Sequence, residues 1–211
     1  MEILNNISEL LQKGKARDVK ELVAKALEQH ISPKDILNEG LIAGMSIIGR
    51  KFKNNEIFVP EVLIAARAMN AGLEILRPAL ISSGVEPVGK ALICTVKGDL
   101  HDIGKNLVKM MIEGQGIECI DLGVDVSEEK IIEAIKELKP SILCLSALLT
   151  TTMMVQKDII DAVIRAGLRD KIRIMVGGAP VTEDFAIQIG ADAYAPDAAS
   201  AAVVARAFFE G

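Results

Sequence analysis

Residues 91–122, ALICTVKGDLHDIGKNLVKMMIEGQGIECIDL, contain a short apolar run, an amphipathic stretch and a second apolar run. The run 91–96 is suited to a buried strand, residues 103–113 have helical spacing, and residues 117–122 suit a second strand. Further strands are predicted at 142–146, 172–176 and 193–195. Further helices are predicted at 128–138, 153–166 and 199–209, and another helix follows the strand 172–176 and ends at Ala186. This alternation predicts an open parallel sheet covered on both faces, in the flavodoxin-like strand order.

The residues before this segment have helical spacing. Apolar side chains recur at that spacing in residues 3–11 and 16–30. Ser32 and Pro33 predict the N-cap and first turn of a third helix, and Pro60 lies in the first turn of a fourth helix. Because the loops between these four helices are short, we expect a small helical bundle that ends near Ile81.

A stretch rich in Gly, Pro and Ser, residues 82–89, separates the two patterns. We therefore expect a helical domain over residues 1–84 and a second domain over residues 89–211. The expected fold class is α/β, with an N-terminal four-helix bundle followed by a flavodoxin-like five-stranded parallel sheet that carries helices on both faces.

Composition and charge exclude several classes of function. The formal net charge is −5 and no long Lys/Arg cluster occurs, which argues against a nucleic-acid partner. No apolar run is long enough to span a bilayer and the N-terminus lacks the pattern of a signal peptide, so we expect no membrane association. The three cysteines, Cys94, Cys119 and Cys144, lie far apart in apolar runs, which is typical of buried thiols in a reducing cytoplasm.

The loop after the first predicted strand is the best candidate for a site, because ligands of open α/β sheets bind beyond the carboxyl ends of strands. It contains neither a Walker motif nor a G-x-G-x-x-G motif. It does contain Asp99 and His101, a pair in which the carboxylate can fix the tautomer of a metal-facing imidazole. These residues are equally compatible with a loop histidine held for packing alone. The other histidine, His30, ends a predicted helix, where a structural role is expected.

One histidine and one aspartate are too few ligands for a zinc site. A tetrapyrrole-type cofactor removes this difficulty, because its macrocycle supplies four equatorial nitrogens and leaves one axial position for the protein. Three motifs of the chain resemble those of a known family. The segment 99–104, DLHDIG, resembles the D-x-H-x-x-G signature of cobalamin-binding domains. Residues 146–148, SAL, resemble the S-x-L element of that family, and Gly177 and Gly178 its double glycine.

The resemblance extends to the helical half, which is similar to the cap of cobalamin-dependent methionine synthase and of corrinoid proteins from methylamine, methanol and methoxyarene methyltransferase systems. It implies that a corrinoid is bound and that His101 is the lower ligand of its cobalt. It also implies that Asp99 hydrogen-bonds His101 and that Thr152, where methionine synthase has Ser, extends the proton relay. These three residues are the catalytic candidates.

The resemblance also implies a larger set of cofactor-binding residues. They are Gly98, Asp99, His101, Asp102, Ile103, Gly104, Ser146, Leu148, Thr150, Gly177, Gly178 and Ala198, with Phe58 and Val59 from the cap. The two glycines of the double-glycine element are expected to let the nucleotide tail lie against the backbone. Phe58 and Val59 are expected to shield the methyl-bearing face, although a hydrophobic staple before a helix explains them equally well.

The implied function is that of a methyl carrier. A substrate-specific methyltransferase would place a methyl group on the cobalt, and a second methyltransferase would pass it to a thiol or a tetrahydrofolate-type acceptor. A reductive activation protein is a further expected partner, and the chain alone is not expected to be catalytic. The alternative is a corrinoid-binding sensor that transfers no methyl group. A flavodoxin-like domain without a ligand is a third interpretation, which the intact motifs oppose.

Overall fold

The computed structural model describes residues 2–84 and 87–210. These residues form two compact units, one within Met1–Pro87 and Gly114–Gly116, the other within Val88–Glu113 and Ile117–Gly211. The predicted linker spans residues 82–89, and its residues 85–86 lie outside the described part of the chain.

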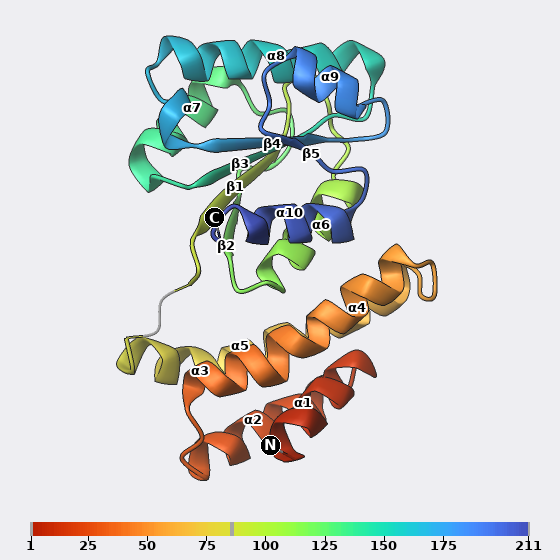
Figure 1. Cartoon of the computed structure of the whole chain (residues 1–211), viewed down its shortest axis with the longest axis vertical. Helices are drawn as coiled ribbons and strands as arrows, with labels where there is room; N and C mark the ends of the chain where they lie inside the picture. Colours follow the sequence, from red (N-terminus) through yellow and green to blue (C-terminus); the bar gives the residue numbers. More distant parts are fainter. Residues whose placement is uncertain (1, 85–86, 211) are drawn as a thin grey trace. The chain divides into compact units, whose positions relative to one another are not determined.

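The first unit is helical (Figure 1). It contains α1 (Glu2–Gln12), α2 (Ala16–Glu28), α3 (Pro33–Asp35), the π-helical segment η1 (Ile36–Ile42), α4 (Ala43–Lys53) and α5 (Val59–Ser82). The segments α3, η1 and α4 follow one another without a break, so this part of the described chain has the four helices that the sequence predicts. Helix α2 packs against α5, and α1 packs against η1 and α4. Ile7, Leu11, Val19 and Val23 are among the side chains fully buried between them.

The third helix differs from its prediction in two details. Pro33 lies in the first turn as predicted, but the expected side-chain cap does not form, because the Ser32 hydroxyl makes no capping hydrogen bond. Instead, the Ser32 carbonyl accepts hydrogen bonds from the backbone N–H groups of Asp35 and Ile36 at 3.0 Å. The π-helical segment η1 was not predicted, since one extra residue in a turn leaves the apolar spacing nearly unchanged.

The second unit contains a parallel sheet in the order β2-β1-β3-β4-β5, the flavodoxin-like order predicted from the sequence. Its strands are β1 (Lys90–Thr95), β2 (Glu118–Asp121), β3 (Ile142–Ser146), β4 (Arg173–Gly177) and β5 (Ala193–Tyr194). Its helices are α6 (Ile103–Glu113), α7 (Glu128–Leu138), α8 (Thr150–Arg165), the short 3-10 helix η2 (Arg169–Lys171), α9 (Glu183–Gln188) and α10 (Ala198–Ala207). Helices α7, α8 and α9 cover one face of the sheet and α6 and α10 the other (Figure 1).

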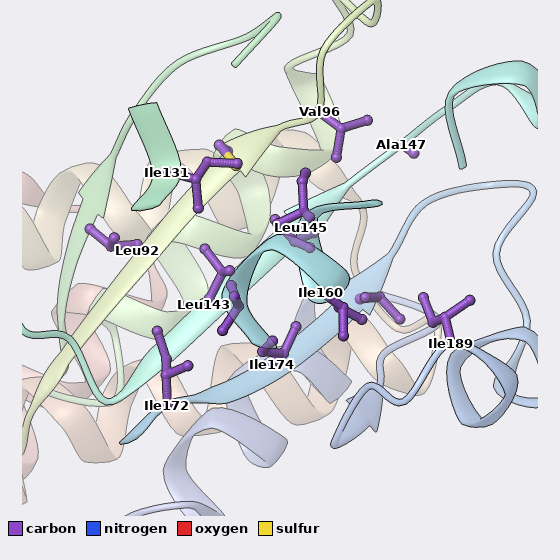
Figure 2. Packing of buried hydrophobic residues seen from close by; sticks show 14 of the residues in the cluster. Leu92, Val96, Ile131, Leu143, Leu145, Ala147, Ile160, Ile172, Ile174 and Ile189 are labelled. Atoms are coloured by element: carbon purple, nitrogen blue, oxygen red, sulfur yellow. The ribbon is translucent and has the colours of Figure 1, made fainter. Parts of the chain in front are cut away.

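Alternation along the strands divides the core between these two faces. Leu92, Leu143 and Ile174 pack in the cluster with Ile131 of α7 and Ile160 of α8 (Figure 2). Their sequence neighbours Ala91, Ile93, Cys144 and Met175 belong to the cluster on the other face, with Ile112 of α6 and Ala201 of α10. Each fully buried Leu or Ile contributes roughly 1.5–3 kcal/mol. The apolar strands thus fix the sheet and bring all five carboxyl ends to one edge.

No helix within residues 2–84 and 87–210 combines the length and the apolar character needed to cross a bilayer.

Candidate functional site at the carboxyl edge of the sheet

The candidate site is centred on Asp99 and His101, in the loop between β1 and α6. Asp99 is fully buried, whereas about half of the His101 side chain is exposed. Asp99 Oδ1 lies 2.6 Å from His101 Nδ1 and accepts a second hydrogen bond from the His101 backbone N–H at 3.1 Å. The carboxylate therefore holds both the ring and the backbone of the histidine.

The second oxygen of Asp99 connects this loop to the one between β3 and α8. Asp99 Oδ2 accepts hydrogen bonds of 2.7 Å from the Leu148 backbone N–H and from the Thr152 hydroxyl. Burial alone would raise the pKa of Asp99. The hydrogen bonds from Leu148, Thr152 and His101 outweigh burial and hold this pKa well below its ordinary value of 3.8. Asp99 is consequently a carboxylate at neutral pH.

An ionised Asp99 determines which nitrogen of His101 carries the proton. Because a carboxylate only accepts hydrogen bonds, Nδ1 donates to Asp99, and in a neutral imidazole the lone pair then lies on Nε2. Such a carboxylate also raises the basicity of the ligating nitrogen. Among the described residues, no group of three or more His, Cys, Asp and Glu side chains is suited to hold a metal ion. The donor set therefore fits a metal that brings its own equatorial ligands and needs one axial imidazole.

Thr152 takes part in this network because α8 begins earlier than the sequence suggests. The predicted start at residue 153 was wrong, since the helix begins at Thr150. Thr152 consequently lies in the first turn, where its hydroxyl accepts a hydrogen bond from the Leu149 backbone N–H at 3.3 Å and donates to Asp99. Three threonines in a row have low helix propensity, but the hydrogen bond from the Leu149 N–H to Thr152 caps the first turn of the helix.

Thr95 is a residue of the site that the sequence did not reveal. It is fully buried at the end of β1, and its hydroxyl donates a hydrogen bond to the His101 backbone carbonyl at 2.7 Å. Together with Asp99 it fixes the histidine backbone from both sides. In the sequence Thr95 is an ordinary β-branched residue inside the predicted strand 91–96, so no pattern indicated this contact.

Large apolar side chains are exposed along the same loops. Leu100 and Ile103, on either side of His101, are 72% and 79% exposed. Leu148 and Leu149, beyond the end of β3, are also exposed. Exposed apolar groups that gather around a polar anchor are typical of a binding surface. A macrocycle with an apolar face and a central metal is suited to this edge.

The glycines near the candidate site differ in backbone conformation and in the space that a side chain would find. A Cβ on Gly104 would meet no atom within 4 Å, so the fold leaves open space there for a ligand. Gly98 has φ of +82°, a conformation that favours glycine. A Cβ on Gly178 would lie 1.8 Å from the Ala147 carbonyl oxygen, and one on Gly177 would lie 3.0 Å from the Ala195 carbonyl oxygen. The double glycine therefore has a structural reason besides the expected contact with a nucleotide tail.

The remaining predicted cofactor-binding residues of this unit lie at the end of a strand and at the starts of helices. Ser146 ends β3 and pairs with Thr95 and Gly177 of the neighbouring strands. Asp102 and Thr150 are exposed, at the starts of α6 and α8. Ala198 is buried in the first turn of α10.

Phe58 and Val59 belong to the helical unit, at the start of α5. The Phe58 side chain is exposed, and its backbone N–H donates to the Glu61 carboxylate at 3.1 Å. This contact is half of a capping box, so the backbone of Phe58 has a structural role while its ring faces away from the core of its unit.

Two protein-family models, both described as "B12 binding domain", match residues 3–77 and residues 89–204. The monomethylamine corrinoid protein 2 of Methanosarcina acetivorans is 46% identical over 189 residues, which are 88% of this chain and 87% of that protein. The trimethylamine corrinoid protein of Methanosarcina barkeri is 42% identical over 189 residues, 89% of this chain and 87% of that protein.

A solved structure, the methanol:cobalamin methyltransferase complex from Methanosarcina barkeri, contains a chain similar to this one. The two chains superpose with a TM-score of 0.88 at 33% sequence identity, over 100% of this chain and 80% of that chain. The similarity therefore covers the helical unit and the sheet together with its carboxyl edge.

Proposed function

This chain belongs to the family of corrinoid proteins with B12-binding domains, and we propose that it carries a methyl group on a corrinoid cobalt between two methyltransferases. The observation that carries this proposal is the buried Asp99 carboxylate, which holds the Nδ1 proton of a half-exposed His101. With that arrangement, His101 would hold the cobalt of a corrinoid, and Asp99 would orient the imidazole. The open space at Gly104 and the exposed Leu100 and Ile103 support a macrocycle above it.

A bound corrinoid supplies a cobalt centre that accepts and releases a methyl group. The residues of the chain would orient the histidine that holds this group. Asp99 would keep the proton on Nδ1 of a cobalt-bound His101, and Thr152 would hold the second oxygen of the carboxylate in place.

The partners follow from the family. A substrate-specific methyltransferase is the first partner, in keeping with the methanol:cobalamin methyltransferase complex. We propose that a second methyltransferase takes the methyl group to a thiol or a tetrahydrofolate-type acceptor, and that a reductive activation protein restores the reduced cobalt. The names of the relatives contain three methyl donors, monomethylamine, trimethylamine and methanol. This variety supports a carrier whose donor is selected by the partner enzyme.

The helical unit is proposed to be a cap, over residues 1–84, and residues 89–211 to be the corrinoid-binding domain. The separate matches at residues 3–77 and 89–204 support this division. Phe58 and Val59 are proposed to shield the methyl-bearing face. A cytoplasmic location is also proposed, because the three cysteines are free and buried, which suits a reducing compartment.

Methyl transfer itself provides the test. The protein is loaded with hydroxocobalamin, reduced chemically, and mixed with a methylamine or methanol methyltransferase and its methylated substrate, while the visible spectrum is followed. We expect conversion to the spectrum of a methylated corrinoid with at least one enzyme. Methyl iodide serves as the control for a reactive cofactor. Methylation by methyl iodide but by none of the enzymes would contradict the role of carrier and favour a sensor.

A further inference from the structure

A second loop contacts the one that carries His101. It comprises residues 121–126, from the last residue of β2 towards the start of α7, and is called the brace loop here. The Asp125 carboxylate accepts a hydrogen bond from the Gly98 backbone N–H at 2.7 Å. The Asp125 backbone N–H donates to the Asp99 carbonyl at 3.0 Å. Asp125 therefore holds the two residues that directly precede Leu100 and His101.

The brace loop also contacts the chain on the other side of His101. Lys105, in the first turn of α6, is almost fully buried, and its ammonium group is paired with the Asp121 carboxylate and hydrogen-bonded to Asn106 Oδ1 at 2.7 Å. Asp121 also accepts from the Gly123 N–H at 2.9 Å. The His101 loop is thus anchored at its start by Asp125 and at its end by Lys105.

The two anchors, Lys105 and Asp125, differ in how their loss would affect the stability of the fold. Lys105 is a buried cation, and removal of Asp121 would leave its buried charge without an ion-pair partner, which destabilises the whole fold. Asp125 is exposed, and its carboxylate accepts a hydrogen bond from the Gly98 backbone N–H. Its backbone has φ of +52°, a left-handed conformation that Asp and Asn tolerate but that is uncommon outside glycine. Such a conformation at an exposed residue indicates that the local contacts require it.

We propose that Asp125 is a positioning residue for the cobalt ligand: it fixes the Gly98–Asp99 turn so that the Asp99 carboxylate meets His101 Nδ1. The proposal rests on the function proposed above. Without the Asp125 carboxylate, the turn at Gly98 keeps only backbone contacts to the brace loop. The orientation of Asp99 then relaxes, and the hydrogen bond from His101 Nδ1 becomes longer or is lost part of the time.

Three substitutions separate the hydrogen bond from charge and from backbone strain. Asp125→Ala removes the acceptor, Asp125→Gly removes it and also relieves the left-handed strain, and Asp125→Asn keeps an acceptor oxygen without the charge. Glu133→Ala, which removes an exposed carboxylate from α7, is the matched control. Thermal unfolding of each variant first establishes that it is folded.

Two readouts report on His101. In the cofactor-free protein, nitrogen NMR of the ring detects the Nδ1–H donated to Asp99. In the protein loaded with cobalamin and reduced to cobalt(II), electron paramagnetic resonance detects the nitrogen nucleus of a bound imidazole. We expect Asp125→Ala and Asp125→Gly to lower the equilibrium constant for histidine ligation by roughly threefold to tenfold, the net effect of one ordinary hydrogen bond. Asp125→Asn and Glu133→Ala are expected to resemble the wild type.

The outcomes distinguish this proposal from the proposed function. If Asp125→Ala keeps the wild-type NMR and paramagnetic signals, Asp125 does not position the ligand. If Asp125→Asn loses the signals as Asp125→Ala does, charge rather than the hydrogen bond is responsible, and the proposal fails in the form given. If the wild type has the Nδ1–H signal and Asp125→Ala loses it, while neither binds cobalamin, Asp125 positions His101 but the corrinoid function is contradicted.

Discussion

The two ends of the parallel sheet each contain an aspartate whose pKa is held below its ordinary value, but the hydrogen-bond partners of the fully buried Asp99 and the partly buried Asp192 differ. Asp192, at the amino end of β5, accepts hydrogen bonds from the Ile174 backbone N–H at 2.7 Å and from the guanidinium groups of Arg169 and Arg173. Asp99, at the carboxyl end of β1, accepts from Leu148, Thr152 and His101. Burial raises both pKa values, and these donors more than offset it.

The difference lies in the charge of the partners. Two arginines neutralise Asp192, and the ion pairs connect η2, β4 and β5 into a closed structural network. Asp99 has no cation among its hydrogen-bond donors as long as His101 is neutral, so its negative charge acts on the imidazole. The same residue type thus stabilises the fold at one end of the sheet and orients a ligand at the other. The following predictions test this contrast.

The largest loss of stability is expected at Gly178, because this residue at the carboxyl edge of the sheet is needed for the fold as well as for the proposed site. In Gly178→Ala, the new Cβ collides with the Ala147 carbonyl and the backbone has φ of +124°, so the free energy of unfolding should fall by roughly 3 kcal/mol or more. Chemical denaturation measures this loss.

Gly104→Ala is the matched control, since its Cβ meets no protein atom. We expect it to leave the stability of the cofactor-free protein unchanged or raise it by up to about 1 kcal/mol, because alanine favours the helix. It should nevertheless weaken the retention of corrinoid. Equal destabilisation by both substitutions would contradict the open space next to Gly104.

Substitution of the two aspartates compares the two ends of the sheet directly. Asp99→Asn and Asp192→Asn each replace one acceptor oxygen by an amide N–H that faces existing donors, so each should lower the free energy of unfolding by about 2 kcal/mol. Only Asp99→Asn should also shift the visible spectrum of the loaded protein away from histidine ligation. A spectral shift of similar size in Asp192→Asn would remove the distinction.

Acid unfolding reports on the same two carboxylates. Because both pKa values are lower in the folded protein than in the unfolded chain, the unfolded state binds more protons in acid. Their stabilisation is therefore fully present above the ordinary value of 3.8 and is lost as the pH falls below it. We expect denaturation midpoints to decrease below about pH 4, and less steeply in either Asn variant. A slope unchanged in both variants would contradict the low pKa values.

The smallest effect is expected at Thr152. Thr152→Val removes the hydroxyl that donates to Asp99 and should cost about 1 kcal/mol of stability. Thr152→Ser keeps the hydroxyl and should cost less than half as much. If the hydroxyl supports the orientation of Asp99 towards His101, Thr152→Val should also shift the visible spectrum of the corrinoid-loaded protein, whereas Thr152→Ser should not. Chemical denaturation measures the stability, and absorption spectra of the loaded variants measure the shift.

Much of the fold was predictable from the sequence, because the spacing of apolar residues indicates where helices and strands lie. The expected bounds of the helix 128–138 and the strand 142–146 agree with α7 and β3. The motif that holds Asp99 and His101 was also identified, since the two residues are close in sequence.

Contacts between distant loops were not predictable in the same way. Asp125 carries no sequence pattern, and its contact with Gly98 appears only once β1 and β2 are paired. The start of α8 was misplaced because helix propensity disfavours three threonines, while the tertiary hydrogen bond to Asp99 stabilises the first turn. The collision between a side chain at Gly178 and Ala147 likewise depends on the register of β3 and β4.

The central claim, that His101 is the axial ligand of a corrinoid, has one direct test. The purified protein is mixed with hydroxocobalamin, excess cofactor is removed, and the visible spectrum is recorded beside those of His101→Ala and, as a control, His30→Ala. The account predicts retained corrinoid with a histidine-ligated spectrum in the wild type and His30→Ala, and a lost or shifted spectrum in His101→Ala. A wild type that retains no corrinoid, or an unchanged spectrum in a folded His101→Ala variant, would contradict it.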